Sequence, residues 1–180
     1  ALAQIKALKQ PTSTLLFAPS WRAADKHSSA AVIKSEVRQS HVLVCDLAQI
    51  DTAKLSTAQV KAEQLSVDGS DIAKSFSQLA LACFESVKAL IKGKSKGKTL
   101  IQIVIAQQQE QLLALSGFLK TVSLENPDFI GQLILTDSTI TTETLATVLK
   151  AERGNAYQPL VRYNGQQREV FHWQELMVAD

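Results

Sequence analysis

Apolar and polar residues alternate along the chain in two periods, which predict strands and helices in turn. The clearest helix has apolar residues three or four apart from Ile72 to Leu90, follows a possible N-cap at Ser70 or Asp71, and ends at Gly93. A β-branched run directly after it, residues 99–106 (TLIQIVIA), predicts a central strand. We expect Leu119 and Val104 to be buried, on a helix and on a central strand of one sheet.

Weaker patterns complete the set of elements. Pro19 places the first strand at a sheet edge, and Asn126-Pro127 end the helix before them. Asn164-Gly165, between residues 160–163 and 168–173, predicts an antiparallel hairpin. The remaining predictions are strands over 14–21, 42–46, 60–67 and 130–136, helices over 1–10, 107–124 and 142–150, and a surface loop over 22–30.

The order of these elements predicts the fold class. Strand and helix alternate through the middle of the chain, which is typical of an α/β fold with a mostly parallel sheet, right-handed crossovers and flanking helices. The hairpin at the C-terminal end adds an antiparallel unit that closes the domain.

Composition and charge limit the function classes. The 180 residues are 46% hydrophobic and carry a net charge of only +2, which indicates a globular domain without a basic surface for nucleic acid or membranes. No apolar run reaches the roughly 20 residues of a membrane span, and the first ten residues do not resemble a signal peptide. Cys45 and Cys83 lie in apolar surroundings, so we expect buried free thiols and a cytoplasmic protein.

The sequence lacks the motif of a dinucleotide site. No G-x-G-x-x-G occurs, and the predicted strands ending at Ala106 and Thr136 run into Gln107-Gln108 and Asp137-Ser138. Residues 93–99 (GKSKGKT) look like a phosphate loop, but they are one residue short between the glycines and precede a strand instead of following one. We therefore expect a solvated turn with exposed Lys92, Lys94, Lys96 and Lys98, where a local anion contact remains open.

Other catalytic patterns are missing too. Neither Tyr157 nor Tyr163 has a lysine four residues later, and no G-x-S-x-G occurs. His27, His41 and His172 have no partners at metal-ligand spacing, and His172 is expected on the rim of a strand. Neither cysteine has the setting of a nucleophile. The prediction is therefore no catalytic, cofactor-binding or metal-binding residue in this chain.

Three segments resemble one family. Residues 115–127 (LSGFLKTVSLENP) resemble the helix signature of the ketoreductase region of modular polyketide synthases, most of all the trans-acyltransferase type. Residues 17–21 (FAPSW) are similar to the opening strand of that region, and residues 161–165 (VRYNG), with Arg168 and the strand to Trp173, to its closing hairpin. The order and spacing of the segments agree with the family over residues 14–176.

The resemblance implies a specific half of the ketoreductase. In this family a truncated Rossmann-like structural subdomain without a cofactor site precedes a catalytic subdomain that carries the glycine-rich loop. The chain looks like the first half: residues 1–13 as a linker or tail of a preceding domain, 14–176 as the structural subdomain, and 177–180 as the junction to the catalytic subdomain. Leu115, Leu119 and Val122 of the signature would pack on the sheet, and Gly117 would permit close approach of a neighbour.

The expected function follows from that resemblance. A non-catalytic scaffold would hold the catalytic half, which reduces β-ketoacyl groups on an acyl carrier protein with NADPH. The implied partners are that catalytic subdomain, neighbouring synthase domains and, indirectly, the acyl carrier protein; neither nucleic acid nor a membrane is expected. The alternative is a vestigial docking module of a polyketide or polyunsaturated fatty acid synthase. An independent small-molecule enzyme would need a site that the sequence does not show.

Overall fold

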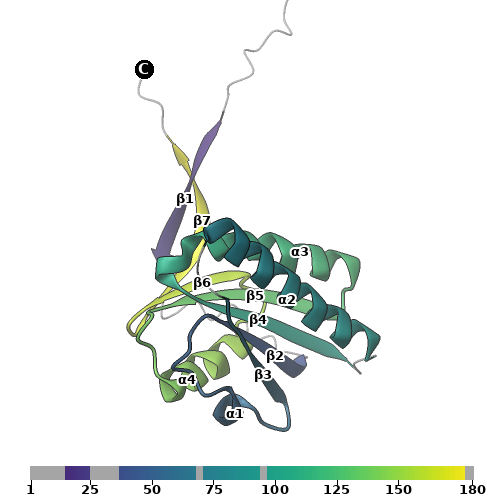
Figure 1. Cartoon of the computed structure of the whole chain (residues 1–180). Coiled ribbons are helices and arrows are strands. Elements are labelled where there is room, and N and C mark those ends of the chain that lie inside the picture. Colours follow the sequence, from purple (N-terminus) through teal and green to yellow (C-terminus); the bar gives the residue numbers. More distant parts are fainter. Residues whose placement is uncertain (1–14, 25–36, 68–70, 94–96, 177–180) are drawn as a thin grey trace, which may run out of the picture.

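The computed structural model describes residues 15–24, 37–67, 71–93 and 97–176, and this part forms one seven-stranded sheet with helices on both faces (Figure 1). The strand order is β1-β7-β6-β5-β4-β2-β3. The strands are β1 Leu16–Ala23, β2 Val37–Cys45, β3 Val60–Leu65, β4 Lys98–Ala106, β5 Phe129–Thr136, β6 Leu160–Asn164 and β7 Gln167–Leu176. The helices are α1 Thr52–Leu55, α2 Ile72–Lys92, the 3₁₀ helix η1 Gln107–Ala114, α3 Leu115–Glu125 and α4 Thr142–Arg153.

Strand direction follows the predicted pattern. β6, β5, β4, β2 and β3 run parallel to one another, whereas β7 is antiparallel to both β6 and β1. The predicted mostly parallel sheet with flanking helices and a closing antiparallel hairpin is confirmed. The predicted helix over 1–10 and most of the predicted loop over 22–30 lie outside the described residues.

The core has two layers because side chains of a strand alternate between the two faces of a sheet. On β4, Ile101, Ile103 and Ile105 pack with α2 and α3, whereas Val104 and Ala106 pack with α1 and α4. Leu119 and Val104 are both buried, as predicted, and they lie on opposite faces of the sheet.

Helix α2 begins and ends where the sequence predicts. Asp71 is its N-cap, and the carboxylate accepts a hydrogen bond from the N–H of Ala73 at 3.0 Å. Gly93 follows its last residue. The buried part of the apolar stripe is Leu79, Cys83 and Val87, whereas Ile72 at the first position is 68% exposed. Phe76, one turn after Ile72, is the first residue of the stripe to pack against the core, and Leu79 is the first that is fully buried.

The single helix predicted over 107–124 is wrong in its first half. Residues 107–114 form a 3₁₀ helix interrupted at Gln109, which has φ −107° and ψ 44°, and the α-helix begins only at Leu115. The side chain of Gln107 donates a hydrogen bond to the Tyr163 carbonyl at 2.7 Å. The two residues are 56 positions apart, so the local hydrophobic pattern could not predict this contact.

The connection through α4 has the opposite hand to the other crossovers. α2, α3 and α4 all carry the chain in the same direction across the sheet, yet α4 lies on the opposite face from α2 and α3 (Figure 1). The expectation of right-handed crossovers throughout is therefore wrong. Two sets of contacts hold α4 on this face: its apolar residues pack in the second core layer, and Glu152 is fully buried and bonded to Gln132, Tyr163 and Arg168 of β5, β6 and β7.

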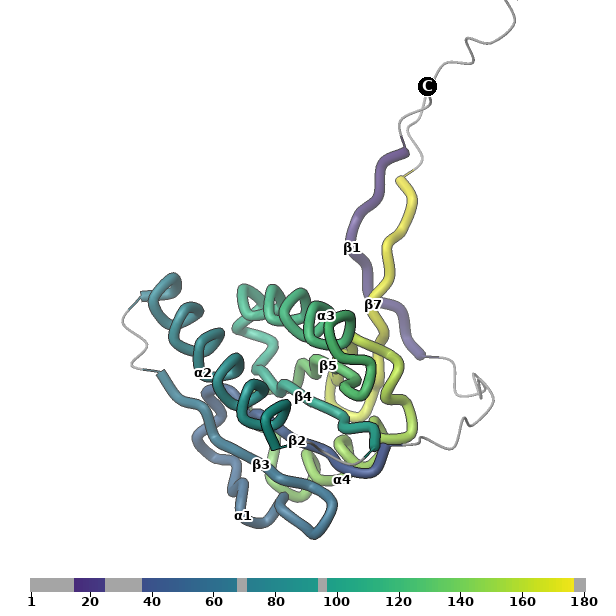
Figure 2. The backbone as a smooth tube through the Cα atoms, turned by 90° about the vertical axis from the view of Figure 1, so that its right-hand side faces the viewer, coloured from purple at the N-terminus to yellow at the C-terminus, as the bar shows by residue number. Residues whose placement is uncertain are grey.

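The predicted antiparallel hairpin is confirmed, and its strands reach one residue further than expected on each side. Asn164 pairs with Gln167, so the two loop residues are Gly165 and Gln166. Gly165 has φ 57°, a left-handed conformation that glycine adopts without steric cost. β7 then continues past the sheet and pairs with β1 as a two-stranded ribbon, and β1 is an edge strand, as Pro19 predicted (Figure 2).

Candidate functional site

The carboxyl ends of β2 and β4 are the position where doubly wound sheets bind their ligands. From β2 the chain passes to β3 on one side, and from β4 it passes to β5 on the other, so the two connections diverge. An open crevice of about 190 Å³ lies there, between these strand ends and the first turns of α2. Its polar lining is Asp46, Ser75, Gln109 and Gln111.

Asp46 and Gln109 join the two turns across this crevice. Asp46 directly follows β2 with φ 53°, a conformation uncommon for a residue with a side chain. The Nε2 of Gln109 donates a hydrogen bond to Asp46 Oδ2 at 2.8 Å. A carboxylate therefore stands where a pyrophosphate would need backbone N–H donors reached across glycine.

The turn after β5 is occupied in a similar way. Asp137 accepts a hydrogen bond from the backbone N–H of Gly165 at 3.0 Å and one from Gln107 Nε2 at 3.3 Å. The turn is thereby tied to the loop of the hairpin. The turns after β2 and β5 contain no glycine, and each contains an aspartate, Asp46 or Asp137. The residues at this edge of the sheet therefore do not fit the pyrophosphate of NADPH.

The lysine-rich turn lies at the opposite edge of the sheet, at the amino end of β4. Lys94 and Lys96 lie outside the described residues. Lys92 is exposed, as predicted, but Lys98 is half-buried: its Nζ donates a hydrogen bond to Tyr157 Oη at 3.0 Å and lies 5.6 Å from the centre of that ring. The prediction that all four lysines are exposed is thus wrong for Lys98.

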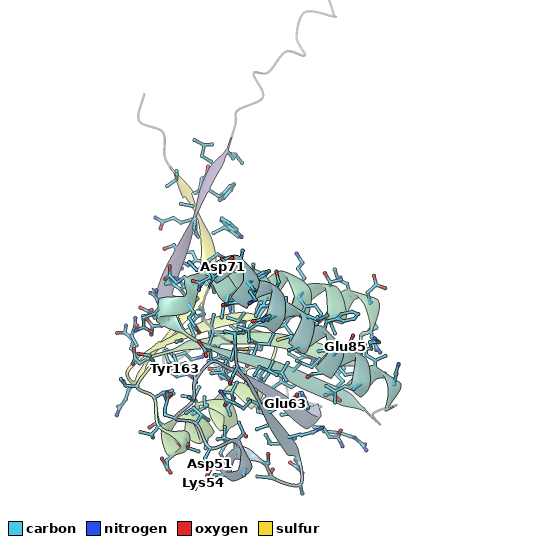
Figure 3. The ribbon with its side chains drawn as sticks, viewed as in Figure 1. Asp51, Lys54, Glu63, Asp71, Glu85 and Tyr163 are labelled. Carbon is cyan, nitrogen blue, oxygen red and sulfur yellow. The ribbon has the colours of Figure 1, made fainter. Side chains whose placement is uncertain are left out.

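A buried cluster around Glu152 was missed by sequence reasoning. Arg168 donates two hydrogen bonds to the carboxylate, from Nε at 2.6 Å and from a terminal nitrogen at 3.0 Å. Tyr163 Oη and Gln132 Nε2 donate two more, at 2.6 and 2.9 Å. Tyr163, labelled in Figure 3, lies on β6, and burial and the hydrogen bond to Glu152 raise the pKa of its hydroxyl.

This cluster is structural in its chemistry. Four donors occupy the two oxygens of Glu152, which is fully buried, so the carboxylate is compensated and has no access to a substrate. One sequence signal pointed to part of this cluster: Tyr163 and Arg168 flank the hairpin loop and pair across the two strands. Glu152 on α4, which accepts hydrogen bonds from both, has no local sequence pattern that would identify it as their partner.

The histidines and cysteines do not form a reactive site in the described residues. His41 is 3% exposed and lies 3.5 Å from Glu63, and burial lowers the pKa of its imidazole. His172 is half-buried on β7, as expected of a rim position, and His27 lies outside the described residues. Cys45 and Cys83 are buried free thiols, as predicted, and the neighbouring Cys83 together with burial raises the pKa of Cys45. No group of three or more potential metal ligands occurs in the described part of the chain.

The family signature forms α3 and its C-terminal end. Leu115, Leu119 and Val122 are buried against the sheet, as expected. Gly117 does not bring a neighbour close, since nothing lies within 4 Å of the place of its missing Cβ, and this expectation is wrong. Gly131 on β5 makes the close approach instead: a Cβ there would lie 2.7 Å from the Cβ of Leu119.

Known proteins with similar sequences or a similar fold are polyketide synthases and a ketoreductase domain. Polyketide synthase PksN of Bacillus subtilis (strain 168) is 27% identical over 180 residues, and polyketide synthase PksL of the same organism is 31% identical over 173 residues. A crystal structure of a ketoreductase domain from the bacillaene assembly line matches 92% of this chain with a TM-score of 0.73, at 17% identity. The chain is therefore similar to segments of two polyketide synthases, and its fold resembles part of a ketoreductase domain. No protein-family model matches it.

The match covers nearly all of this segment but little of its relatives. The aligned regions are 95% and 93% of the chain, yet only 3% and 4% of the length of PksN and PksL. Of the bacillaene ketoreductase chain, 39% is covered. The predicted resemblance to the ketoreductase region is confirmed, and the fold is that of part of a ketoreductase domain. None of the helices in the described residues has the length and apolar character needed to cross a membrane.

Proposed function

We propose that residues 14–176 are the non-catalytic structural half of a polyketide synthase ketoreductase of the trans-acyltransferase type. In this proposal residues 1–13 are a linker or the tail of a preceding domain, and 177–180 lead into the catalytic half. That half reduces β-ketoacyl groups on an acyl carrier protein with NADPH in the cytoplasm. This chain supplies a rigid body against which the catalytic half folds.

The observation that carries the proposal is the crevice at the carboxyl ends of β2 and β4. The sheet has a switch point where related folds bind a nucleotide. Asp46 and Gln109 occupy it with a mutual hydrogen bond. A ketoreductase fold whose nucleotide position is lined by a carboxylate and side-chain amides, without the glycines of a phosphate-binding turn, suits a supporting role, with the cofactor held elsewhere.

The extensive burial of the central strands is also consistent with a scaffold role. The side chains from Val42 to Cys45 on β2 and from Thr99 to Ala106 on β4 are all buried. A sheet packed this closely on both faces is a stiff platform. The bonds around Glu152 then fix the hairpin, from which β7 extends, to the body of the domain.

The test compares three proteins: this chain alone, the catalytic half alone, and the intact ketoreductase region with both in one polypeptide. NADPH oxidation with a β-ketoacyl pantetheine thioester is the assay. We expect turnover by the intact region only, together with a lower melting temperature for the catalytic half alone. A catalytic half that is equally stable and active without this chain would contradict the scaffold role, and so would turnover by this chain alone.

A further inference from the structure

The ribbon of β1 and β7 has one aromatic face. Alternate residues of a strand project to the same side, and in the register Pro19 pairs with Trp173 and Trp21 with Phe171. Phe17 follows on the same face of β1. We call this surface the aromatic face: Phe17, Pro19, Trp21, Phe171 and Trp173.

The inner end of the aromatic face belongs to the core. Trp21 and Phe171 meet edge to face with ring centres 5.5 Å apart, and both pack against the core cluster beneath α2 and α3. The guanidinium of Arg162 covers the Trp21 ring at 4.6 Å. The ribbon is therefore anchored at its base in a fixed orientation.

The outer end of the aromatic face is exposed in the part of the chain that the structure describes. The Trp173 ring meets Phe171 edge to face, with ring centres 5.5 Å apart, but Trp173 is 63% exposed, and Phe17 is 50% exposed. No other element of the described residues stands beside this part of the ribbon (Figures 2 and 3). Contiguous exposed aromatic rings on a fixed two-stranded element are typical of a protein interface.

The position of the chain ends indicates what covers this surface. Leu16 pairs with Leu176, so both ends of the described ribbon lie together at its far tip (Figure 2). Any polypeptide joined to either end starts beside the aromatic face. This chain matches only 39% of the bacillaene ketoreductase chain, so the larger part of such a domain remains to be placed.

We infer that the aromatic face is the surface on which the catalytic half of the ketoreductase packs. The inference rests on the proposed function and adds its contact surface. The partner offers an apolar patch that receives the rings of Trp173 and Phe17. Both residues are exposed in this chain alone, so they contribute little to its own stability and much to the joint structure.

The experiment uses Trp173→Ser and Phe17→Ser, with Phe84→Ser on the outer face of α2 as the matched control, since Phe84 is 48% exposed. Each variant is made in the 180-residue chain and in the intact ketoreductase region. We expect the ribbon variants to leave the melting temperature of the chain nearly unchanged. In the intact region they should lower the melting temperature and reduce turnover about tenfold or more, whereas Phe84→Ser changes neither.

Fluorescence gives a second readout, because Trp21 and Trp173 are the two tryptophans of the chain. Acrylamide should quench the emission of the chain alone and quench much less in the intact region, after subtraction of tryptophans in the catalytic half.

The outcomes separate the inference from the proposed function. Full activity and stability of the intact ribbon variants would overturn the aromatic face as the contact while leaving the scaffold role in place. A catalytic half that needs no part of this chain would overturn both. Self-association of the chain that Trp173→Ser abolishes, seen by analytical ultracentrifugation, would overturn the inference and assign the face to a second copy.

Discussion

At Gly131 the α3 helix lies close against the sheet. A Cβ at this position would lie 2.7 Å from Leu119 Cβ and 3.0 Å from the Leu119 carbonyl oxygen, so the helix would have to shift. We expect Gly131→Ala to lower the free energy of unfolding by about 1–3 kcal/mol in denaturant melts. Gly117→Ala is the control, since it meets nothing within 4 Å on the exposed side of α3.

The control variant should change the free energy of unfolding in the opposite direction. Alanine in a helix interior is favoured over glycine by about 0.5–1 kcal/mol, so Gly117→Ala should stabilise the protein. Destabilisation by Gly117→Ala, or a neutral Gly131→Ala, would mean that the distance between α3 and β5 is not as described.

His41 is a single residue that makes the free energy of unfolding depend on pH. Its imidazole is 3% exposed beside Glu63 and the charge of Lys61, and burial is the largest effect that lowers its pKa below the ordinary 6.5. Between the folded and the unfolded pKa the unfolded chain binds more protons, so stability rises with pH through this window. We expect the free energy of unfolding to fall when the pH drops from about 7.5 to 5.

The variant His41→Leu isolates this term, because leucine does not titrate. Denaturant melts at several pH values should show a shallower loss of stability on acidification than in the unmodified chain. An unchanged slope would place the acid sensitivity in other groups.

At the scale of elements, the turn after α2 tests which lysines matter. Lys98 holds Tyr157 by a hydrogen bond and by its position near the ring, whereas Lys92 is exposed at the end of α2. We expect Lys98→Ala to cost about 0.5–1.5 kcal/mol and Lys92→Ala less than about 0.5 kcal/mol. Neither lysine should confer nucleotide affinity; saturable ATP binding that Lys98→Ala abolishes would contradict the structural role of this residue.

The elements predicted correctly are those with local signals. The β-branched run of β4, the stripe and caps of α2 and the Asn164-Gly165 pair each act within a few residues, and each gave the right element. The errors share a different cause. η1 departs from the α-helix where Gln107 and Gln109 bond to distant residues, and Lys98 is fixed by Tyr157, 59 residues away.

The candidate site follows the same division. The lack of glycine in the turns after Ala106 and Thr136 could be read from the chain, but the bond between Asp46 and Gln109 spans 63 residues and could not. The face on which α4 lies depends on a buried carboxylate whose four donors come from β5, β6 and β7. The aromatic face could not be predicted from the sequence, because it depends on the register in which β1 pairs with β7, and the hydrophobic periodicity does not give that register.

At the scale of the whole molecule, the absence of a phosphate cradle makes a prediction about NADPH. A pyrophosphate needs backbone N–H groups at a helix N-terminus. After β4 this chain instead has a 3₁₀ helix interrupted at Gln109, and Asp46 and Asp137 lie at the turns. We expect the 180-residue chain to bind NADPH no tighter than about 1 mM, or roughly −4 kcal/mol.

Calorimetry on the chain alone measures this affinity, with the intact ketoreductase region as the positive control. The intact region should bind NADPH about a hundredfold or more tighter, because the second half supplies the glycine-rich turn. Asp46→Gly removes the charge and the strained side chain from the end of β2, yet it should not create binding, since Gln109 and the 3₁₀ helix still occupy the place of the phosphates. Micromolar binding of NADPH by the chain alone, competed by NADP⁺, would locate the cofactor in this half and reverse the proposed division of labour.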